Sequence, residues 1–309
     1  MNQKLDFQSL IIIGEGRSGT TLLSSFLNSQ EGCIVYSDLL KYWYIEHKNL
    51  GITSIISPLS EREKNVLFTN LIAEGWKFGI TSFDGIGREE VNTSLDLLQL
   101  AFLSLDETNS AKIIGTKMTR HYEYLDEFLA QGIKIIFCQR DPRDVLLSSK
   151  NRFSDYNLFQ RTNYWQESFE VAKRYNEDPG FHFLRFEDLL DGGTRLGEIE
   201  KLSDFLGLEI NPAPRKMSIR NGISFISNSS FDDVNEIFDE AAMYRWKSNL
   251  TSQEVIFTSK YLSREIKFLD YQPYEVENQE YHRIYKDYKA YSRKDRARSL
   301  LRKIVNKIL

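Results

Sequence analysis

A short apolar run that ends in a glycine-rich loop constrains the fold of this chain more than any other feature. Residues 10–13 read Leu-Ile-Ile-Ile, which is typical of a buried strand. The run is followed by the loop Gly14-Glu15-Gly16-Arg17-Ser18-Gly19-Thr20-Thr21. Apolar residues then recur at positions 22, 23, 26 and 27, which is helical spacing. The segment therefore predicts a strand, a tight loop and a helix in direct succession.

The same succession of a strand and a helix returns along the chain. Further apolar runs predict strands, with helical patterns between or after them: strands at residues 112–117, 134–139 and 181–185, and helices at residues 124–129, from Pro142 onward and at residues 187–207. Such alternation favours a parallel sheet that is covered on both faces. We therefore expect an α/β fold with a P-loop-type parallel sheet flanked by helices.

No proline- or serine-rich linker and no repeat divides the chain, so we expect a single domain over residues 1–275 with helical insertions. Residues 42–105 are less regular and carry an aromatic cluster. We interpret them either as a helical insertion that packs on the sheet or as a wall of the site that binds the acceptor substrate, if the chain is a transferase. The aromatic residues are Tyr42, Trp43, Tyr44, Trp76 and Phe78.

Residues 276–309 have a different pattern. Apolar residues at positions 297, 300, 301, 304, 305 and 308 share one helical face, and arginines and lysines occupy the others. This pattern predicts a basic amphipathic helical tail. Such a helix could dock on its own domain, self-associate with a partner subunit, or contact an anionic membrane peripherally.

The loop at residues 14–21 predicts an anion site. Backbone amides and the start of a helix favour a phosphate at such a turn, and glycines let the backbone approach it closely. The spacing of Gly14 and Gly19 matches that of nucleotide triphosphatases, but Thr20 stands where those proteins carry lysine. Arg17 supplies a cation instead, and the hydroxyl groups of Ser18, Thr20 and Thr21 add neutral donors.

A second anion site is predicted where the strand at residues 134–139 ends. Arg140 follows that strand directly, and Ser148 lies on the next helix about two turns later. An Arg- and Asp-rich turn can also be a solvated salt-bridge cluster. Together with the first loop, the carboxyl ends of parallel strands fit a nucleotide with phosphates at both ends.

These two elements resemble the sulfotransferases that use 3′-phosphoadenosine 5′-phosphosulfate (PAPS), in particular the bacterial, carbohydrate and tyrosylprotein members. Residues 16–23 are similar to their 5′-phosphosulfate loop, and residues 140–148 to their 3′-phosphate motif. The similarity extends over roughly residues 10–271. Phe186 is one departure, because many relatives carry tyrosine there.

The resemblance implies roles for individual residues. Donor-binding residues would be Gly16, Arg17, Ser18, Gly19, Thr20, Thr21, Arg140, Ser148 and Arg152, with Ser230 and Arg245 closing over the nucleotide. For catalysis it implies that Arg17 and Lys117 neutralise the leaving group and that Asp38 is the general base. The alternatives for Asp38 are a helix cap, with Glu46, His47 or His121 as the base in its place.

Composition excludes other classes of partner and cofactor. The net charge of −4 gives no basic field for nucleic acid. The two cysteines and four histidines show no metal-ligand spacing, so we expect no metal and no disulfide. The N-terminus resembles neither a signal peptide nor a membrane anchor, which predicts a cytoplasmic protein.

The sequence thus predicts transfer of a sulfuryl group from PAPS to an acceptor hydroxyl. A carbohydrate or lipid-like acceptor is the first expectation, because aromatic residues suit a sugar face and a basic tail suits a lipid. A peptide tyrosine or a small natural product stays open. The alternatives in other classes are a P-loop kinase-like phosphotransferase and a non-catalytic nucleotide-binding module.

Overall fold

The computed structural model describes residues 7–39, 41–75, 91–105, 110–213, 218–220, 223–224, 238–275 and 277–290. Two compact units divide the chain: residues 1–139 with 174–228, and residues 140–173 with 229–309. We refer to them as the sheet unit and the helical unit. Of the predicted tail at residues 276–309, residues 276 and 291–309 lie outside the described residues, and so do Trp76, Phe78 and Ser230.

The sheet unit is built on a five-stranded parallel sheet with the order β2-β3-β1-β4-β5. Its strands are β1 (Gln8–Gly14), β2 (Cys33–Ser37), β3 (Ile113–Lys117), β4 (Lys134–Gln139) and β5 (Phe181–Arg185). Leu10, Ile11, Ile12 and Ile13 are fully buried, as expected for a central strand covered on both faces. The predicted parallel α/β sheet is therefore confirmed, and β2 is a strand that the apolar pattern did not single out.

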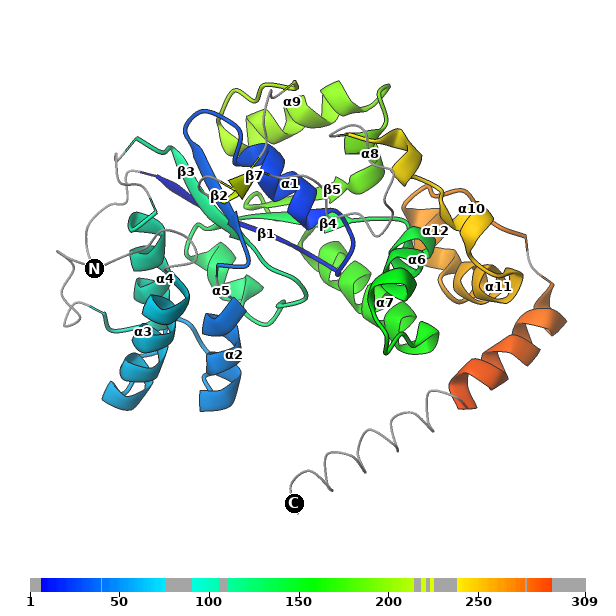
Figure 1. Ribbon diagram of the computed structural model, residues 1–309, viewed down its shortest axis with the longest axis horizontal. Helices are drawn as coiled ribbons and strands as arrows, with labels where there is room; N and C mark the ends of the chain where they lie inside the picture. Colours follow the sequence, from blue (N-terminus) through cyan, green and yellow to red (C-terminus); the bar gives the residue numbers. More distant parts are fainter. Residues whose placement is uncertain are drawn as a thin grey trace, which may run out of the picture. The chain divides into compact units, whose positions relative to one another are not determined.

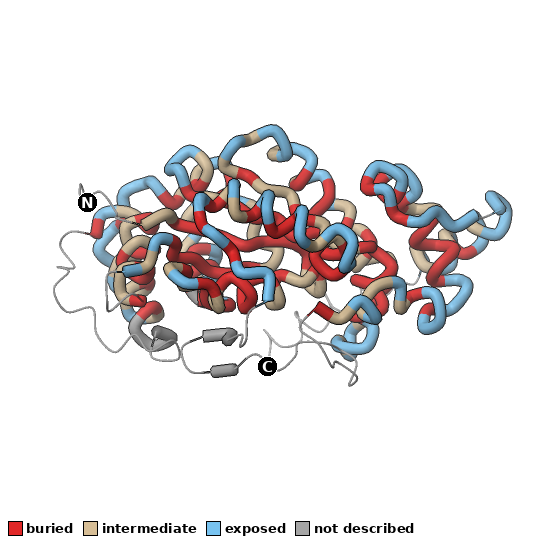
Figure 2. Tube along the Cα trace, turned by 90° about the horizontal axis from the view of Figure 1, so that it is seen from above, coloured by how far each residue is buried: buried red, intermediate tan, exposed pale blue. Residues whose placement is uncertain are grey.

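Helices cover both faces of this sheet. Figure 1 shows α1 and α9 on one face, and α2, α4 and α5 on the other. The described helices of the unit are α1 (Thr20–Leu27), α2 (Lys41–Leu50), α3 (Glu61–Gly75), α4 (Ser94–Leu103), α5 (Leu125–Ala130), α8 (Phe186–Leu190) and α9 (Arg195–Leu206). Strand β6 (Ser218–Arg220) pairs antiparallel with β7 (Ile223–Ser224). Figure 2 shows most of the sheet buried and the outer faces of the helices exposed, and the edge strand β5 is only partly buried.

The prediction of a single helical region at residues 187–207 is wrong. The segment forms two helices, α8 and α9, which a turn separates. The carboxylate of Asp191 accepts a hydrogen bond of 2.7 Å from the amide of Gly193. Because this short bond competes with the helical pattern, the chain leaves the helix at Asp191 and starts a new one at Arg195.

The helical unit begins directly after β4. It contains α6 (Pro142–Arg152), α7 (Leu158–Tyr175, whose last two residues belong to the sheet unit), the 3-10 turn η3 (Glu240–Ala242), α10 (Trp246–Asn249), α11 (Ser252–Tyr261), α12 (Ser263–Phe268) and a helix over residues 278–290. Its core holds Leu146, Leu158, Ile256, Phe257 and Ile284. Pro142 is at the first turn of α6, as predicted, and Asp141 caps that helix through the amide of Arg143.

Candidate functional site

The glycine-rich loop lies between β1 and α1, at the carboxyl end of the central strand. Gly19 precedes the helix with φ of 91°, and Arg17 has φ of 74°, so the loop turns through two left-handed residues. The amide of Ser18 donates to the carbonyl of Glu15 over 3.2 Å, which closes the turn. The loop therefore presents backbone amides and the start of α1 at one place, which is the geometry of an anion site.

The hydroxyl group of Ser18 is an unused donor inside this loop. Its side chain is fully buried, and among the described residues its Oγ atom has no hydrogen-bond partner. A buried polar group without a partner costs about 1–3 kcal/mol. An anion bound in the loop would provide the missing acceptor, so the loop fits the phosphate end of a ligand.

Lys117 and Asp38 lie together at the ends of neighbouring strands. The ammonium group of Lys117 donates to both carboxylate oxygens of Asp38, over 2.9 and 3.0 Å. β2 pairs with β3 so that Ser37 stands beside Lys117, and the amide of Asp38 donates to the carbonyl of Lys117. The Lys117 side chain is buried, whereas the Asp38 side chain is 50% exposed, so the carboxylate is open to a second molecule.

The chain that follows β3 contacts the glycine-rich loop. The amide of Arg120 donates to the carbonyl of Gly14 over 3.1 Å, and its guanidinium lies 3.2 Å from the buried carboxylate of Glu15. The loop and the Lys117 strand end are therefore joined side by side. Sequence reasoning missed both Glu15 and Arg120, although an acidic residue inside a predicted anion loop is a signal that a basic partner is needed.

The two histidines named as alternative bases have different surroundings. His47 is fully buried, with Nδ1 2.6 Å from the Trp43 carbonyl and Nε2 2.6 Å from the Ser94 hydroxyl. His121 stacks on Tyr44, with ring centroids 3.5 Å apart, and burial lowers its pKa to about 4. His121 is therefore neutral at physiological pH and can accept a proton, whereas both nitrogens of His47 are engaged in the core.

Arg140 and Ser148 belong to the helical unit. The backbone carbonyl of Arg140 accepts a hydrogen bond of 2.9 Å from Nε1 of Trp165, and the guanidinium of Arg140 donates one of 2.6 Å to the Ala242 carbonyl. Ser148 is buried on α6, and Arg152 is exposed on the last turn of the same helix. Arg140 thus lies just before α6, and the turn η3 holds its side chain through the Ala242 carbonyl.

Two other charged residues of this motif point inward. Arg143 is fully buried, forms two hydrogen bonds with Asp141 over 2.7 and 2.9 Å, and lies 3.9 Å from the ring centre of Trp246. Asp144 is also buried. Arg245, a predicted donor-binding residue, pairs with Asp239 over 3.1 Å and donates to the Ala241 carbonyl.

The described part of the chain lacks two kinds of feature. It contains no group of three or more His, Cys, Asp or Glu residues placed to hold a metal ion. None of its helices is long and apolar enough to cross a membrane.

Curated proteins with similar sequences are sulfotransferases. Sulfotransferase 2A1 of Homo sapiens is 24% identical over 183 residues, which are 50% of this chain and 63% of the human protein. Sulfotransferase 2A1 of Macaca fascicularis is 25% identical over 154 residues, which are 40% of this chain and 53% of that protein. The chain therefore spans less than two thirds of the length of these relatives.

Solved structures share the fold at lower identity. The sulfotransferase domain from the curacin biosynthetic pathway has a TM-score of 0.52 and 17% identity, covering 87% of this chain and 99% of that domain. The sulfotransferase domain of the Synechococcus PCC 7002 olefin synthase has the same TM-score and identity, with 85% and 97% covered. A family model described as the sulfotransferase family matches residues 9–212. The chain therefore belongs to the sulfotransferase family.

Proposed function

We propose that this protein transfers a sulfuryl group from PAPS to the hydroxyl group of an acceptor. The observation that carries the proposal is the convergence, at the carboxyl ends of β1, β3 and β2, of the glycine-rich loop, Lys117 and Asp38. A sulfuryl transferase needs an anion cradle, a cation and a base at one place. The family match supports the same reaction.

The donor residues follow from the two motifs. The loop amides, Arg17 and the unpartnered hydroxyl of Ser18 would hold the 5′-phosphosulfate, with Gly16, Gly19, Thr20 and Thr21 completing the loop. Arg140, Ser148 and Arg152 would hold the 3′-phosphate, and Ser230 and Arg245 would close over the nucleotide. Arginine suits both ends, because its planar group can bind an oxyanion through two parallel hydrogen bonds.

The chemical step is an in-line displacement at sulfur. The acceptor oxygen forms a bond to sulfur, the bond from sulfur to the bridging phosphate oxygen breaks, and 3′,5′-adenosine bisphosphate leaves. The acceptor proton would go to Asp38, whose exposed carboxylate is open to solvent. Lys117 and Arg17 would neutralise the charge that develops on the bridging oxygen.

The pairing of Asp38 with Lys117 links the two catalytic roles. In the structure the ammonium group contacts both oxygens of the carboxylate. Donor binding would draw Lys117 toward the bridging oxygen, which frees Asp38 to accept a proton. His121 is the second candidate for the base, because burial keeps its ring neutral.

For the acceptor we propose a carbohydrate or lipid-like hydroxyl. The aromatic composition of residues 42–78 supports this choice, because aromatic faces suit the apolar face of a sugar or a lipid chain. Trp43 and Tyr44 themselves are buried and pair with His47 and His121, so these two rings favour a helical insertion that packs on the sheet. A peptide tyrosine and a small natural product are the other acceptors to include in a screen.

The test is a transfer assay with sulfur-labelled PAPS and pools of each acceptor class, with products identified by mass spectrometry. We expect label in an acceptor pool with wild type and loss of label with Lys117→Ala. Binding of 3′,5′-adenosine bisphosphate should be detected by calorimetry and should exceed that of ATP with Mg²⁺, because the loop lacks the lysine of nucleotide triphosphatases. Preferential binding of ATP would favour the kinase-like alternative. Nucleotide binding without transfer would favour a binding module.

A further inference from the structure

Asp144 is a buried carboxylate to which the proposed reaction gives no role. It is 1% exposed and sits in the first turn of α6. One of its oxygens accepts from the amide of Tyr244 over 2.7 Å, and the other accepts from the amide of Trp246 over 3.0 Å. A single side chain therefore holds both ends of a turn that lies a hundred residues further along the chain.

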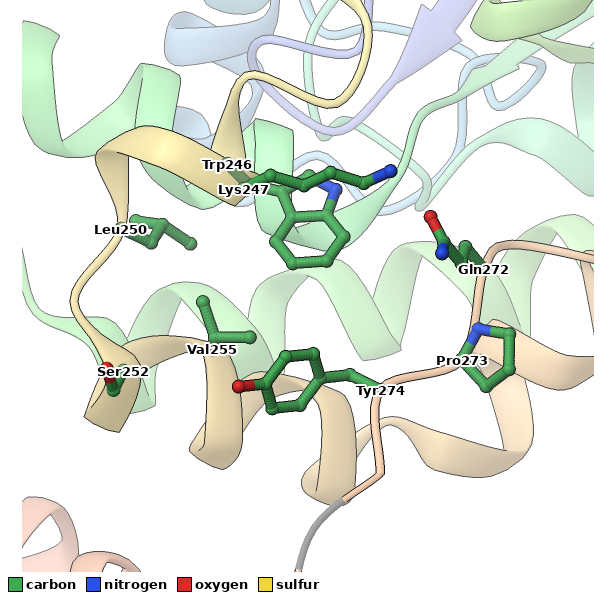
Figure 3. Close-up of a pocket in the computed structure, with 8 residues that line it drawn as sticks. All are labelled: Trp246, Lys247, Leu250, Ser252, Val255, Gln272, Pro273 and Tyr274. Atoms are coloured by element: carbon green, nitrogen blue, oxygen red, sulfur yellow. The ribbon is translucent and has the colours of Figure 1, made fainter.

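The turn that Asp144 holds is tight and well packed. Tyr244 has φ of 59°, a left-handed conformation that costs a side-chain-bearing residue about 1–2 kcal/mol. The Trp246 ring packs with Leu147, Leu250 and Val255. That ring also pairs edge to face with Tyr274, with ring centroids 6.4 Å apart, and both residues line a cavity of about 300 Å³. Figure 3 shows the residues that line this cavity. Because the turn is strained, it needs the two hydrogen bonds to keep its shape.

The same turn follows the residues that orient Arg140. The guanidinium of Arg140 donates to the carbonyl of Ala242, two residues before Tyr244. Arg245 lies within the turn, and its side chain is directed back to Asp239 and the Ala241 carbonyl. A displacement of the turn would therefore move the acceptor that fixes the Arg140 side chain.

The charge state of Asp144 is consistent with this arrangement. Burial raises its pKa to about 6, the charge of Asp141 adds to that effect, and the charge of Arg140 opposes it. The carboxylate is therefore ionised at neutral pH. The ionised form is an acceptor only and suits the two amides, whereas the protonated form would also need an acceptor for its own proton.

We propose that Asp144 is a positioning residue for the donor nucleotide: by holding the amides of Tyr244 and Trp246, it fixes the segment that orients Arg140 toward a 3′-phosphate. This inference rests on the proposed function. Asp144 acts through Arg140 and contacts no reacting atom.

The test compares two nucleotides that differ by the 3′-phosphate. Asp144→Asn keeps the size of the side chain but turns an amide NH₂ toward one of the two backbone N–H groups. Calorimetry should give about tenfold weaker binding of 3′,5′-adenosine bisphosphate, the effect of one misplaced charge-assisted hydrogen bond. Binding of adenosine 5′-phosphosulfate, which lacks the 3′-phosphate, should change little, so the ratio of the two affinities should fall.

Glu254→Gln is the matched control. Glu254 is a buried carboxylate of the same unit, and it pairs with Lys150 of α6 and caps α11. Its replacement should lower the melting temperature and leave the affinity ratio unchanged. A merely structural role for Asp144 predicts the same behaviour for both variants, and that result would overturn the proposal.

Two further outcomes are distinguishable. Wild type that binds neither nucleotide would remove the donor site itself, and the positioning role with it. If Asp144→Asn does not fold, the amide protons of Tyr244 and Trp246 can be followed by NMR in wild type. They should shift together as the Asp144 carboxyl group titrates. Amide protons that do not respond would overturn the proposal without any variant.

Discussion

The ring of Phe186 occupies the space that a side chain on Gly19 would need. A Cβ atom built on Gly19 would lie 2.0 Å from Cδ2 of Phe186, far inside van der Waals contact. Gly19 also has φ of 91°. The first residue of α8 therefore packs against the start of α1, and the position tolerates only glycine for two separate reasons.

Gly19→Ala should consequently destabilise the fold more than the substitution of another left-handed glycine. We expect the free energy of unfolding to fall by about 1–2 kcal/mol because of the backbone and by a further 1–3 kcal/mol, roughly, because of the overlap with Phe186. Gly132→Ala is the control, since Gly132 has φ of 71° but no atom within 4 Å of the added carbon. Urea unfolding measures both. Equal losses would show that the contact with Phe186 carries no energy.

The pairing of Asp38 with Lys117 leads to a kinetic prediction. Asp38→Asn removes the proton acceptor but keeps its size, so turnover should fall by about 10²- to 10⁴-fold, the usual contribution of a general base. Affinity for 3′,5′-adenosine bisphosphate should stay close to that of wild type. Wild-type turnover in this variant would remove Asp38 from the base role and leave His121 as the candidate.

Arg140→Ala should give the opposite result. Its side chain is proposed to bind the 3′-phosphate, so nucleotide affinity should fall by about 10- to 100-fold, the range for a charge-assisted hydrogen bond. Turnover at saturating donor should change much less. Arg174→Ala is a suitable control, because Arg174 is a largely exposed arginine that pairs with Asp126. Steady-state kinetics with varied PAPS separates the two effects.

Some of these features could be predicted from the sequence and others could not. Strands β1, β3, β4 and β5 could be predicted because they are short apolar runs, and parallel strands place their carboxyl ends at one edge of the sheet. The contact between Lys117 and Asp38 could not be predicted, since it depends on β2 lying beside β3. β2 carries no distinctive pattern, and strand order is a long-range property.

The Arg140 motif shows a second limit. Its sequence gives four charged residues within five positions, and nothing local distinguishes those that face a ligand from those that face the core. In the structure Arg143 and Asp144 are buried, and both contact the segment around Trp246. These partners are about a hundred residues away, so pattern reasoning could not assign them.

His47 gives a prediction for the dependence of stability on pH. Burial lowers its pKa from 6.5 to about 4, so the unfolded chain binds a proton that the folded protein does not. The stability that this histidine contributes is fully present above pH 6.5 and is lost as the pH falls toward 4, by about 3 kcal/mol. His47→Gln should therefore flatten the plot of unfolding free energy against pH in this range. His282→Gln, which replaces an exposed histidine, is the control variant.

The buried pair of Asp141 and Arg143 gives the last prediction. Both side chains are fully buried and are joined by two hydrogen bonds, and the Arg143 guanidinium also stacks on Trp246. Arg143→Met leaves the Asp141 carboxylate buried without its cation, so we expect a loss of about 3–5 kcal/mol. The double variant Asp141→Asn with Arg143→Met removes that charge while Asn can still cap α6, and it should recover a large part of the loss. Urea unfolding of the two single variants and the double variant gives the coupling energy directly. If the losses of the single variants simply add, the ion pair contributes nothing to stability, and the stacking on Trp246 alone explains why an arginine is buried there.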